Sequence, residues 1–304
     1  MADWDIIIIG AGVAGLTAAA TAARLGATVM VLDRLGAGGQ IATVDAISNF
    51  PGYADPVAGI EVAPAMQEQA EGLGAEFQLT EVSAVMPTGD GFELTCDNGP
   101  LTCRALIIAA GSSRTPLGLD NEEKLAGRGV SHCASCDGPL FRGERVVVAG
   151  GGDSAFDEAA VLADHVAHVT VVYPDAEPVA AQTAVTRLRA LANVDERPGC
   201  VVAAISGQDT VNGVTLRNVT TGETEPHDAV GVFVYTGQIP NTGFLTGLVD
   251  LDGDGKVLAD ADLQTSQPGV FVAGDIRAKS GGLIATAIGD GAIAAASAFH
   301  FSKR

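Results

Sequence analysis

Two segments of the chain, about 140 residues apart, share one pattern of strand, glycine turn, helix and strand. The first copy has its parts at residues 5–9, 10–12, 13–25 and 28–32, followed by Asp33. The second copy has them at 145–149, 150–152, 154–164 and 168–173. Strands that are apolar throughout are typical of parallel sheets covered on both faces. The repetition predicts an α/β fold of two doubly wound, Rossmann-like dinucleotide-binding domains.

The connecting segments indicate that the second domain is inserted in the first. An apolar strand over 106–111 runs into the polar stretch 112–116, and a corresponding strand over 231–235 runs into 236–242. We interpret these segments as paired crossovers, after which the chain returns to the first domain. The expected boundaries are therefore 1–115 with 245–304 for the first domain and 116–244 for the second. A length of 304 residues suits two domains of roughly 150 residues each.

The charge balance excludes several kinds of partner. The chain has 37 acidic residues against 17 Lys and Arg, a formal charge of −20, which disfavours nucleic acid and anionic membrane surfaces. No apolar run reaches the ~20 residues that span a bilayer. Acids near the start, where a signal peptide is basic, favour a cytoplasmic protein. The scarcity of lysine, four in all, fits a halophile and an ordinary acidic enzyme equally well.

The first glycine turn has the context of a dinucleotide site. Gly10, Gly12 and Gly15 follow a predicted strand and open a predicted helix, and Asp33 comes about 20 residues later. Such glycines allow a tight turn and close approach of a pyrophosphate, while the helix N-terminus supplies N–H donors. We expect Asp33 to accept hydrogen bonds from ribose hydroxyls.

Two of the five cysteines form the motif Cys133-Ala-Ser-Cys136, followed by Asp137. Spaced in this way at a helix start, they can close a small disulfide, and the helix dipole favours one thiolate. Half of a zinc site is the alternative, but Cys96 and Cys103 have the wrong spacing and the histidines are scattered, so no metal is expected. Cys96, Cys103 and Cys200 are assigned to packing.

These motifs together resemble the low-molecular-weight thioredoxin reductases. The resemblance rests on segments distributed in order over nearly the whole chain: 10–15, 38–40, 49–52, 133–138, 150–155, 240–242, 274–275 and 289–291. It implies a discontinuous FAD domain and an inserted pyridine-nucleotide-type domain that carries the dithiol. It also implies a thioredoxin-like protein as partner and a homodimer.

The resemblance assigns roles to individual residues. Cys136 becomes the sulfur next to the flavin, Cys133 its partner, and Asp137 the group that transfers the proton. The expected FAD contacts are Gly10, Gly12, Ala14, Gly15, Asp33, Gly39, Gln40, Asn49, Val82, Ala110, Gly111, Gly274, Asp275, Leu283 and Ile284. One departure is clear: Gly282-Leu283 stands where the family usually has an Arg-Gln pair.

The second glycine turn departs further from the family. The residues expected at a nucleotide there are Gly150, Gly152, Asp153, Ser154, Ala155 and Asp175. In NADPH-dependent relatives a His-Arg-Arg segment comes after the next strand. Residues 173–180 at this place in the chain include no basic residue and two acidic residues. Acids would repel a 2′-phosphate, so NADPH is disfavoured. NADH with Asp175 on the ribose, or a ferredoxin-like carrier, is expected instead.

Other interpretations stay open. The same parts could form a flavin-dependent dithiol oxidase that acts on a small molecule and passes electrons to oxygen, or a redox sensor with little turnover. Asp250-Leu-Asp-Gly-Asp-Gly255 resembles the start of a calcium loop, but Ala261 stands where the final Glu belongs, which favours a polar hairpin. His132 is expected to pack or face solvent.

Overall fold

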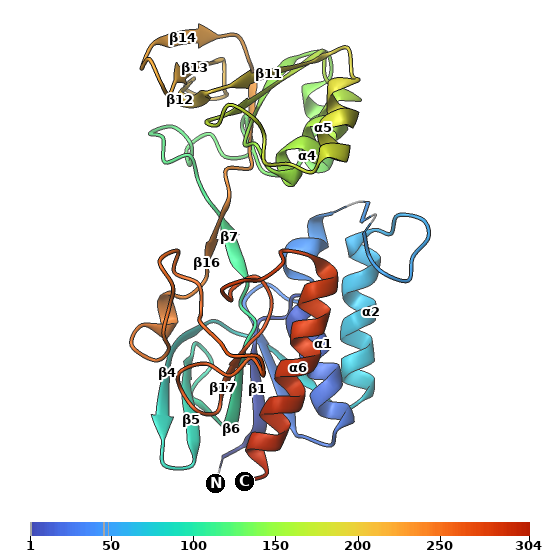
Figure 1. Ribbon diagram of the computed structural model, residues 1–304, viewed down its shortest axis with the longest axis vertical. Coiled ribbons are helices and arrows are strands. Elements are labelled where there is room, and N and C mark those ends of the chain that lie inside the picture. Colours follow the sequence, from blue (N-terminus) through green and yellow to red (C-terminus); the bar gives the residue numbers. More distant parts are fainter. Residues whose placement is uncertain (1, 45, 48) are drawn as a thin grey trace. The chain divides into compact units, whose positions relative to one another are not determined.

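The computed structural model describes residues 2–44, 46–47 and 49–304 and divides the chain into two compact units (Figure 1). Unit 1 comprises Met1–Ser113 with Ile239–Arg304, and unit 2 comprises Arg114–Gln238. The chain passes between them along β7 (Ser112–Arg114) and β16 (Gln238–Pro240), which pair with each other. It rejoins unit 1 at Ile239, earlier than the expected residue 245, because Asn241 already bonds the backbone there, its Nδ2 donating to the Ala110 carbonyl at 2.7 Å.

Unit 1 is built on a seven-stranded sheet. Its parallel strands are β1 (Trp4–Ile9), β2 (Val29–Asp33), β3 (Glu76–Leu79), β6 (Leu101–Ile108) and β17 (Val270–Val272). Two antiparallel strands, β4 (Val82–Thr88) and β5 (Gly91–Cys96), extend it beyond β6. The inner strands are β-branched and fully buried, as expected for a sheet covered on both faces.

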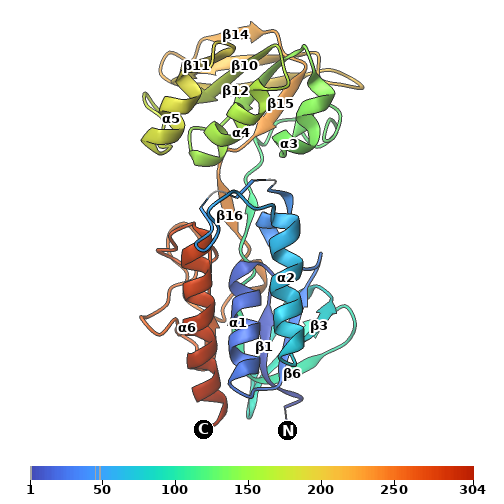
Figure 2. The ribbon, with the colours of Figure 1, turned by 90° about the vertical axis from the view of Figure 1, so that its right-hand side faces the viewer.

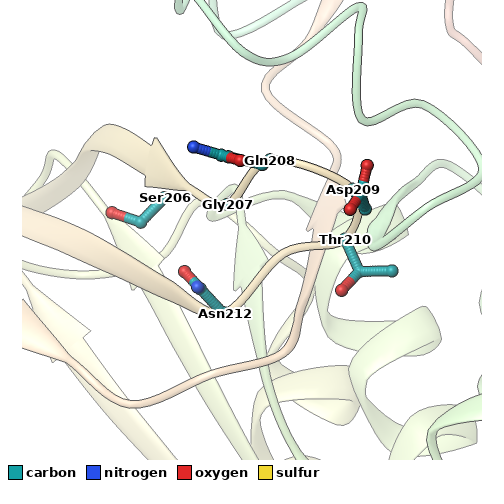
Figure 3. Close-up of a pocket in the computed structure, with 6 residues that line it drawn as sticks. All are labelled: Ser206, Gly207, Gln208, Asp209, Thr210 and Asn212. Carbon is teal, nitrogen blue, oxygen red and sulfur yellow. The ribbon is translucent and has the colours of Figure 1, made fainter.

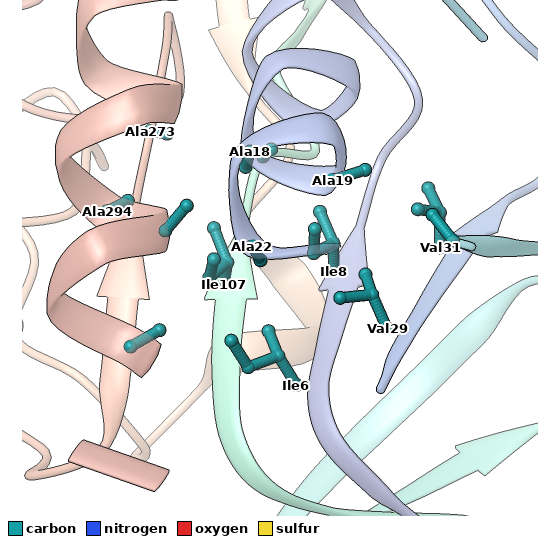
Figure 4. Packing of buried hydrophobic residues seen from close by; sticks show 14 of the residues in the cluster. Ile6, Ile8, Ala18, Ala19, Ala22, Val29, Val31, Ile107, Ala273 and Ala294 are labelled. Atoms are coloured by element: carbon teal, nitrogen blue, oxygen red, sulfur yellow. The ribbon is translucent and has the colours of Figure 1, made fainter. Parts of the chain in front are cut away.

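In the part of the chain that the structure describes, the α-helices of unit 1 are α1 (Val13–Arg24), α2 (Gly59–Gly72) and α6 (Ile284–Ser302). Small side chains let α1 and α6 approach closely, with Ala18, Ala22 and Ala294 fully buried over Ile8 and Ile107 of the sheet (Figure 4). Helix α6 is long and apolar enough to cross a membrane by length and composition alone. On one face, its Ala294, Ala295 and Ala298 are buried in the apolar cluster that α1 and the sheet form in this unit.

Unit 2 repeats the parallel arrangement (Figure 2). Its five strands are ordered β11 (Val194–Pro198), β10 (His168–Tyr173), β9 (Arg145–Ala149), β15 (Gly231–Val234) and β8 (Val130–Ser131). One face packs on α4 (Asp153–Ala163) and α5 (Gln182–Arg189) through Val146 and Val148. The alternate residues Val147 and Ala149 face an antiparallel sheet of β12 (Cys200–Ser206), β13 (Gly213–Asn218) and β14 (Thr224–His227).

Short helical turns lie at the ends of several strands. They are η1 (Gly39–Thr43), α3 (Ala134–Asp137), η2 (Gly138–Phe141) and η3 (Gly243–Leu245). Because the parallel strands of each unit end at one edge of its sheet, the loops that carry the predicted site residues gather at that edge.

Candidate functional site

The first glycine turn leaves room for a ligand at the N-terminus of α1. Gly10 has φ 107°, and a Cβ there would lie 2.3 Å from the Ala109 carbonyl oxygen. At Gly15 a Cβ would lie 1.8 Å from the Gly10 oxygen, so this contact requires glycine. The space at Gly12 is open: among the described residues, the nearest atom to a Cβ there would be the Gly39 Cα, at 4.0 Å. An open, positive helix end beside a glycine turn suits a pyrophosphate.

Asp33, at the end of β2, is held by three backbone N–H groups. Its Oδ2 accepts from Ala11 at 2.7 Å, and its Oδ1 accepts from Leu35 at 2.7 Å and Gly36 at 2.9 Å. The carboxylate therefore braces the glycine turn, in addition to the ribose contact expected from the sequence.

The remaining predicted flavin residues of unit 1 lie on several loops. Gln40, exposed at the start of η1, donates from Nε2 to the Ser112 hydroxyl at 3.0 Å. Ala110 and Gly111 follow β6 after one intervening residue, and Asn49 lies exposed in the loop before α2. Val82 is buried in one apolar cluster with Leu32, at the end of β2.

The turn after β17 carries Gly274 and Asp275. A Cβ at Gly274 would lie 2.9 Å from the Cβ of Ala14, so this turn packs directly against α1. Asp275 Oδ1 accepts the Ser280 hydroxyl at 3.0 Å. Leu283, half exposed, precedes the first residue of α6, Ile284. Segments distant in the sequence thus contribute to one unit.

Cys133 and Cys136 are joined by a disulfide at the start of α3. Cys136 is exposed and Cys133 is half buried, and the Cys136 N–H donates to the Cys133 Sγ at 3.2 Å. The buried Ser131 hydroxyl donates to Asp137 Oδ2 at 2.6 Å and accepts the Cys133 N–H at 3.1 Å. One serine therefore connects the dithiol to the carboxylate assigned to proton transfer.

Ser131 was missed in the sequence, and so was Glu158 on α4. Glu158 Oε2 accepts the Ala134 N–H at 2.9 Å and the Tyr235 hydroxyl at 3.0 Å. Burial and the nearby carboxylate raise the pKa of Tyr235, so this hydroxyl stays a donor. The only sequence signal was the closeness of Ser131 to Cys133. His132, which is half buried, has Nδ1 within hydrogen-bonding distance of the Val234 carbonyl oxygen, at 3.2 Å.

The second glycine turn is partly covered by the segment after β10. Gly150 has φ 144°, and the space at Gly152 is open. The Gly151 carbonyl accepts N–H groups from Val179 at 2.9 Å and Ala180 at 3.0 Å. In the first turn of α4, Asp153 Oδ1 accepts the Ala181 N–H at 2.6 Å; Ser154 is exposed and Ala155 is buried. A phosphate could approach this helix end, beside the carboxylate of Asp153.

Both arginines of α5 are engaged by carboxylates. Arg189 binds Glu196 with two hydrogen bonds, at 2.6 and 3.0 Å, and lies 3.7 Å from Glu177. The hydrogen bond from Arg189 holds the pKa of Glu196 below its usual value, and Tyr173 donates to the same carboxylate at 2.6 Å. Arg187 pairs with Asp157. Asp175 and Glu177 are exposed, so the segment after β10 has an acidic surface.

Two other features belong to loops rather than to the site. The Asp250–Gly255 segment forms a hairpin turn in which Asp252 Oδ1 accepts the N–H groups of Asp254 and Lys256, both at 2.9 Å. A hollow after β12 is lined only by residues 206–210 and 212 (Figure 3). It contains no predicted site residue.

Residues 4–291 match the family described as pyridine nucleotide-disulphide oxidoreductase. The thioredoxin reductase of Treponema pallidum is 39% identical and aligns over 98% of this chain and 97% of its own. The thioredoxin reductase of Bacillus subtilis is 36% identical, over 98% and 94%.

Solved structures agree. Thioredoxin reductase from Lactococcus lactis, in its FR conformation, has a TM-score of 0.95 at 34% identity and 99% coverage of both chains. A ferredoxin-flavin thioredoxin reductase from Clostridium acetobutylicum is more distant, with a TM-score of 0.53, 26% identity and coverage of 98% and 97%. These comparisons confirm the predicted α/β fold with two Rossmann-like domains.

Proposed function

The chain belongs to the low-molecular-weight thioredoxin reductases of the pyridine nucleotide-disulphide oxidoreductase family, and we propose that it passes electrons through FAD and the Cys133–Cys136 dithiol to the disulfide of a thioredoxin-like protein. The observation that carries this proposal is the disulfide at the start of α3 beside Asp137, which Ser131 holds in place.

Unit 1 offers a set of residues that fits FAD. The open space at Gly12 would take the pyrophosphate, and Asp33 and Asp275 supply carboxylates for the hydroxyls of the cofactor. The remaining contacts would come from Gly10, Ala14, Gly15, Gly39, Gln40, Asn49, Val82, Ala110, Gly111, Gly274, Leu283 and Ile284. When bound, FAD supplies the two electrons that open the disulfide.

The dithiol then does the exchange chemistry. Two electrons and two protons convert the Cys133–Cys136 disulfide to two thiols. One thiolate attacks the disulfide of the partner and forms a mixed disulfide, and the second sulfur displaces it. The partner leaves with two thiols, and the Cys133–Cys136 bond is restored. In this proposal Asp137 gives or takes the proton, and the hydrogen bond from Ser131 supports the orientation of its carboxylate.

The electron donor follows from the charges after β10. A 2′-phosphate would meet exposed Asp175 and Glu177, while Arg187 and Arg189 already bind carboxylates. Each missing phosphate–arginine contact costs ~1.5–3 kcal/mol of binding free energy, so the loss of two such contacts weakens the binding of NADPH by about 10²-fold or more. NADH, with Gly150, Gly152, Ser154 and Ala155 around its pyrophosphate, or a ferredoxin-like carrier, is the proposed donor. We also propose that the protein acts as a cytoplasmic homodimer.

The test is anaerobic bleaching of the flavin by NADPH, NADH and reduced ferredoxin, compared side by side. We expect the purified protein to be yellow, to bleach with NADH or ferredoxin, and then to reduce a thioredoxin. Cys133→Ser should bleach without reducing thioredoxin. A colourless protein that releases no flavin on denaturation would contradict the proposal. Rapid peroxide formation with a small dithiol, and no activity on thioredoxins, would identify a dithiol oxidase instead.

A further inference from the structure

Arg277 and Asp290 form a buried ion pair in unit 1 that the electron-transfer chemistry does not use. The guanidinium makes two hydrogen bonds to the carboxylate, Nε to Oδ2 at 2.6 Å and Nη2 to Oδ1 at 2.8 Å. The Asp290 side chain is 8% exposed and that of Arg277 is 18% exposed. Burial of two charges is costly unless their geometry is good and their other polar atoms find partners. The further contacts of this pair are therefore significant.

The pair joins α6 to the turn that carries Asp275. Asp290 Oδ2 also accepts the Gly274 N–H at 3.1 Å, and Arg277 Nη1 donates to the Ala278 carbonyl at 3.1 Å. The Arg277 N–H closes the turn on the Gly274 carbonyl, also at 3.1 Å. Asp290 thereby secures both ends of the turn 274–277, and Asp275 lies between them.

A second set of hydrogen bonds runs from this turn toward α6. The Ser280 hydroxyl donates to Asp275 Oδ1 at 3.0 Å and accepts the Gly282 N–H at 3.3 Å. Gly282 and Leu283 have no polar side chain, so any polar contact of theirs with a ligand has to come from the backbone. Backbone contacts are effective only when the loop is already ordered, because ordering it on binding costs conformational entropy.

We propose that the Arg277–Asp290 pair is a positioning device for FAD: it orders Asp275 and the loop 278–283 and so replaces the side-chain contacts absent at Gly282 and Leu283. This inference rests on the proposed function. The buried charges are retained because they attach the loop to α6, beside the point where Gly274 meets α1. The pair touches no reacting atom and acts through Asp275 and the backbone.

The experiment measures FAD affinity on flavin-free protein, by titration with FAD and flavin fluorescence. Asp290→Asn keeps the shape of the side chain and removes the charge; we expect the dissociation constant to rise about tenfold or more, the equivalent of one charge-assisted hydrogen bond. Arg277→Lys keeps the charge but loses the two-point contact, and about a threefold rise is expected. Asp157→Asn removes an exposed aspartate–arginine pair in unit 2 and serves as the matched control; its affinity should equal that of the wild type.

Melting of the flavin-free proteins separates positioning from a purely structural role. A lower melting temperature with wild-type FAD affinity in Asp290→Asn and Arg277→Lys would overturn the proposal, as would equal affinity and equal melting. If Asp290→Asn does not fold, Arg277→Lys supplies the same comparison. Wild-type protein that takes up no FAD would overturn the proposed function instead, so the two failures are distinct.

Discussion

Ser131 shows how one hydroxyl can organise the redox segment. Replacement by alanine leaves the Cys133 N–H and the Asp137 carboxylate without their shared partner, which costs about 1–3 kcal/mol when such groups are buried. For Ser131→Ala we expect about tenfold slower reoxidation of the reduced dithiol by an aromatic disulfide, measured by stopped flow. Ser131→Thr, which keeps the hydroxyl, should recover most of the rate. Ser83→Ala, at an exposed position of β4, is the control, and an unchanged rate in Ser131→Ala would contradict the assigned role.

The other cysteines provide a second prediction at this scale. Cys103 is fully buried, and burial raises the pKa of its thiol to about 12; burial also raises the pKa of the Cys96 thiol. Only thiolates alkylate readily, so at pH 8 iodoacetamide should spare both residues in the native, reduced protein. Cys133 and Cys136 should be modified first. Mass spectrometry measures the labelling of each cysteine, with denatured protein as the control. Labelling of Cys103 in the native protein as fast as in the denatured protein would contradict its burial.

The contact between helices α1 and α6 can be tested with two glycines of the same helix. A Cβ at Gly291 would lie 2.3 Å from the Ala14 carbonyl oxygen, whereas a Cβ at Gly289 would meet no described atom within 4 Å beyond its own helix. Gly291→Ala should therefore lower the free energy of unfolding by about 1–3 kcal/mol and reduce flavin retention. Gly289→Ala should raise it by up to about 1 kcal/mol. Denaturant titration of both variants makes the comparison, and equal effects would refute the close approach of the helices.

Strand β11 and helix α5 are linked by Glu196 and Arg189, and this link should depend on pH. The folded-state pKa of Glu196 is below its usual 4.5, chiefly through the hydrogen bond from Arg189. Its stabilisation is therefore complete above pH 4.5 and is lost as the pH falls through the lowered value. The difference in unfolding free energy between wild type and Glu196→Gln should be constant from pH 7 to about 5 and shrink below that. Glu225→Gln removes one partner of an exposed pair with a separation of 4.0 Å and is the surface control.

The elements were largely predictable, but their partners were not. The predicted helices 13–25 and 154–164 correspond to Val13–Arg24 and Asp153–Ala163, because continuous apolar runs and glycine turns are local signals. The sheet β12–β14 was missed, since β12 buries only Val202 and Ile205 and β14 buries none of its residues. Pairs such as Arg277–Asp290 and Glu158–Tyr235 depend on where distant elements pack. No spacing rule in the sequence reports such contacts.

For the molecule as a whole, the acidic segment after β10 should decide the electron donor. Asp175→Arg places a cation where a 2′-phosphate would lie, and we expect it to improve the rate of flavin bleaching by NADPH relative to NADH by about tenfold, the worth of one charge-assisted contact. Asp209→Arg changes the net charge equally at a distant hairpin and is the control. An equal gain in both variants would indicate general attraction rather than a specific site. Fast bleaching of the wild type by NADPH would contradict this interpretation of the segment.

The pairing of β7 with β16 has a consequence for how such a chain can be rearranged. Because the chain enters and leaves Arg114–Gln238 through neighbouring strands, the cut ends of that segment lie next to each other. A short linker could therefore close unit 1 after excision, and the excised segment would keep its own sheet and core. The inserted unit is in this sense an exchangeable cassette. One such unit could be replaced by another without any change in the strand order of the unit 1 sheet.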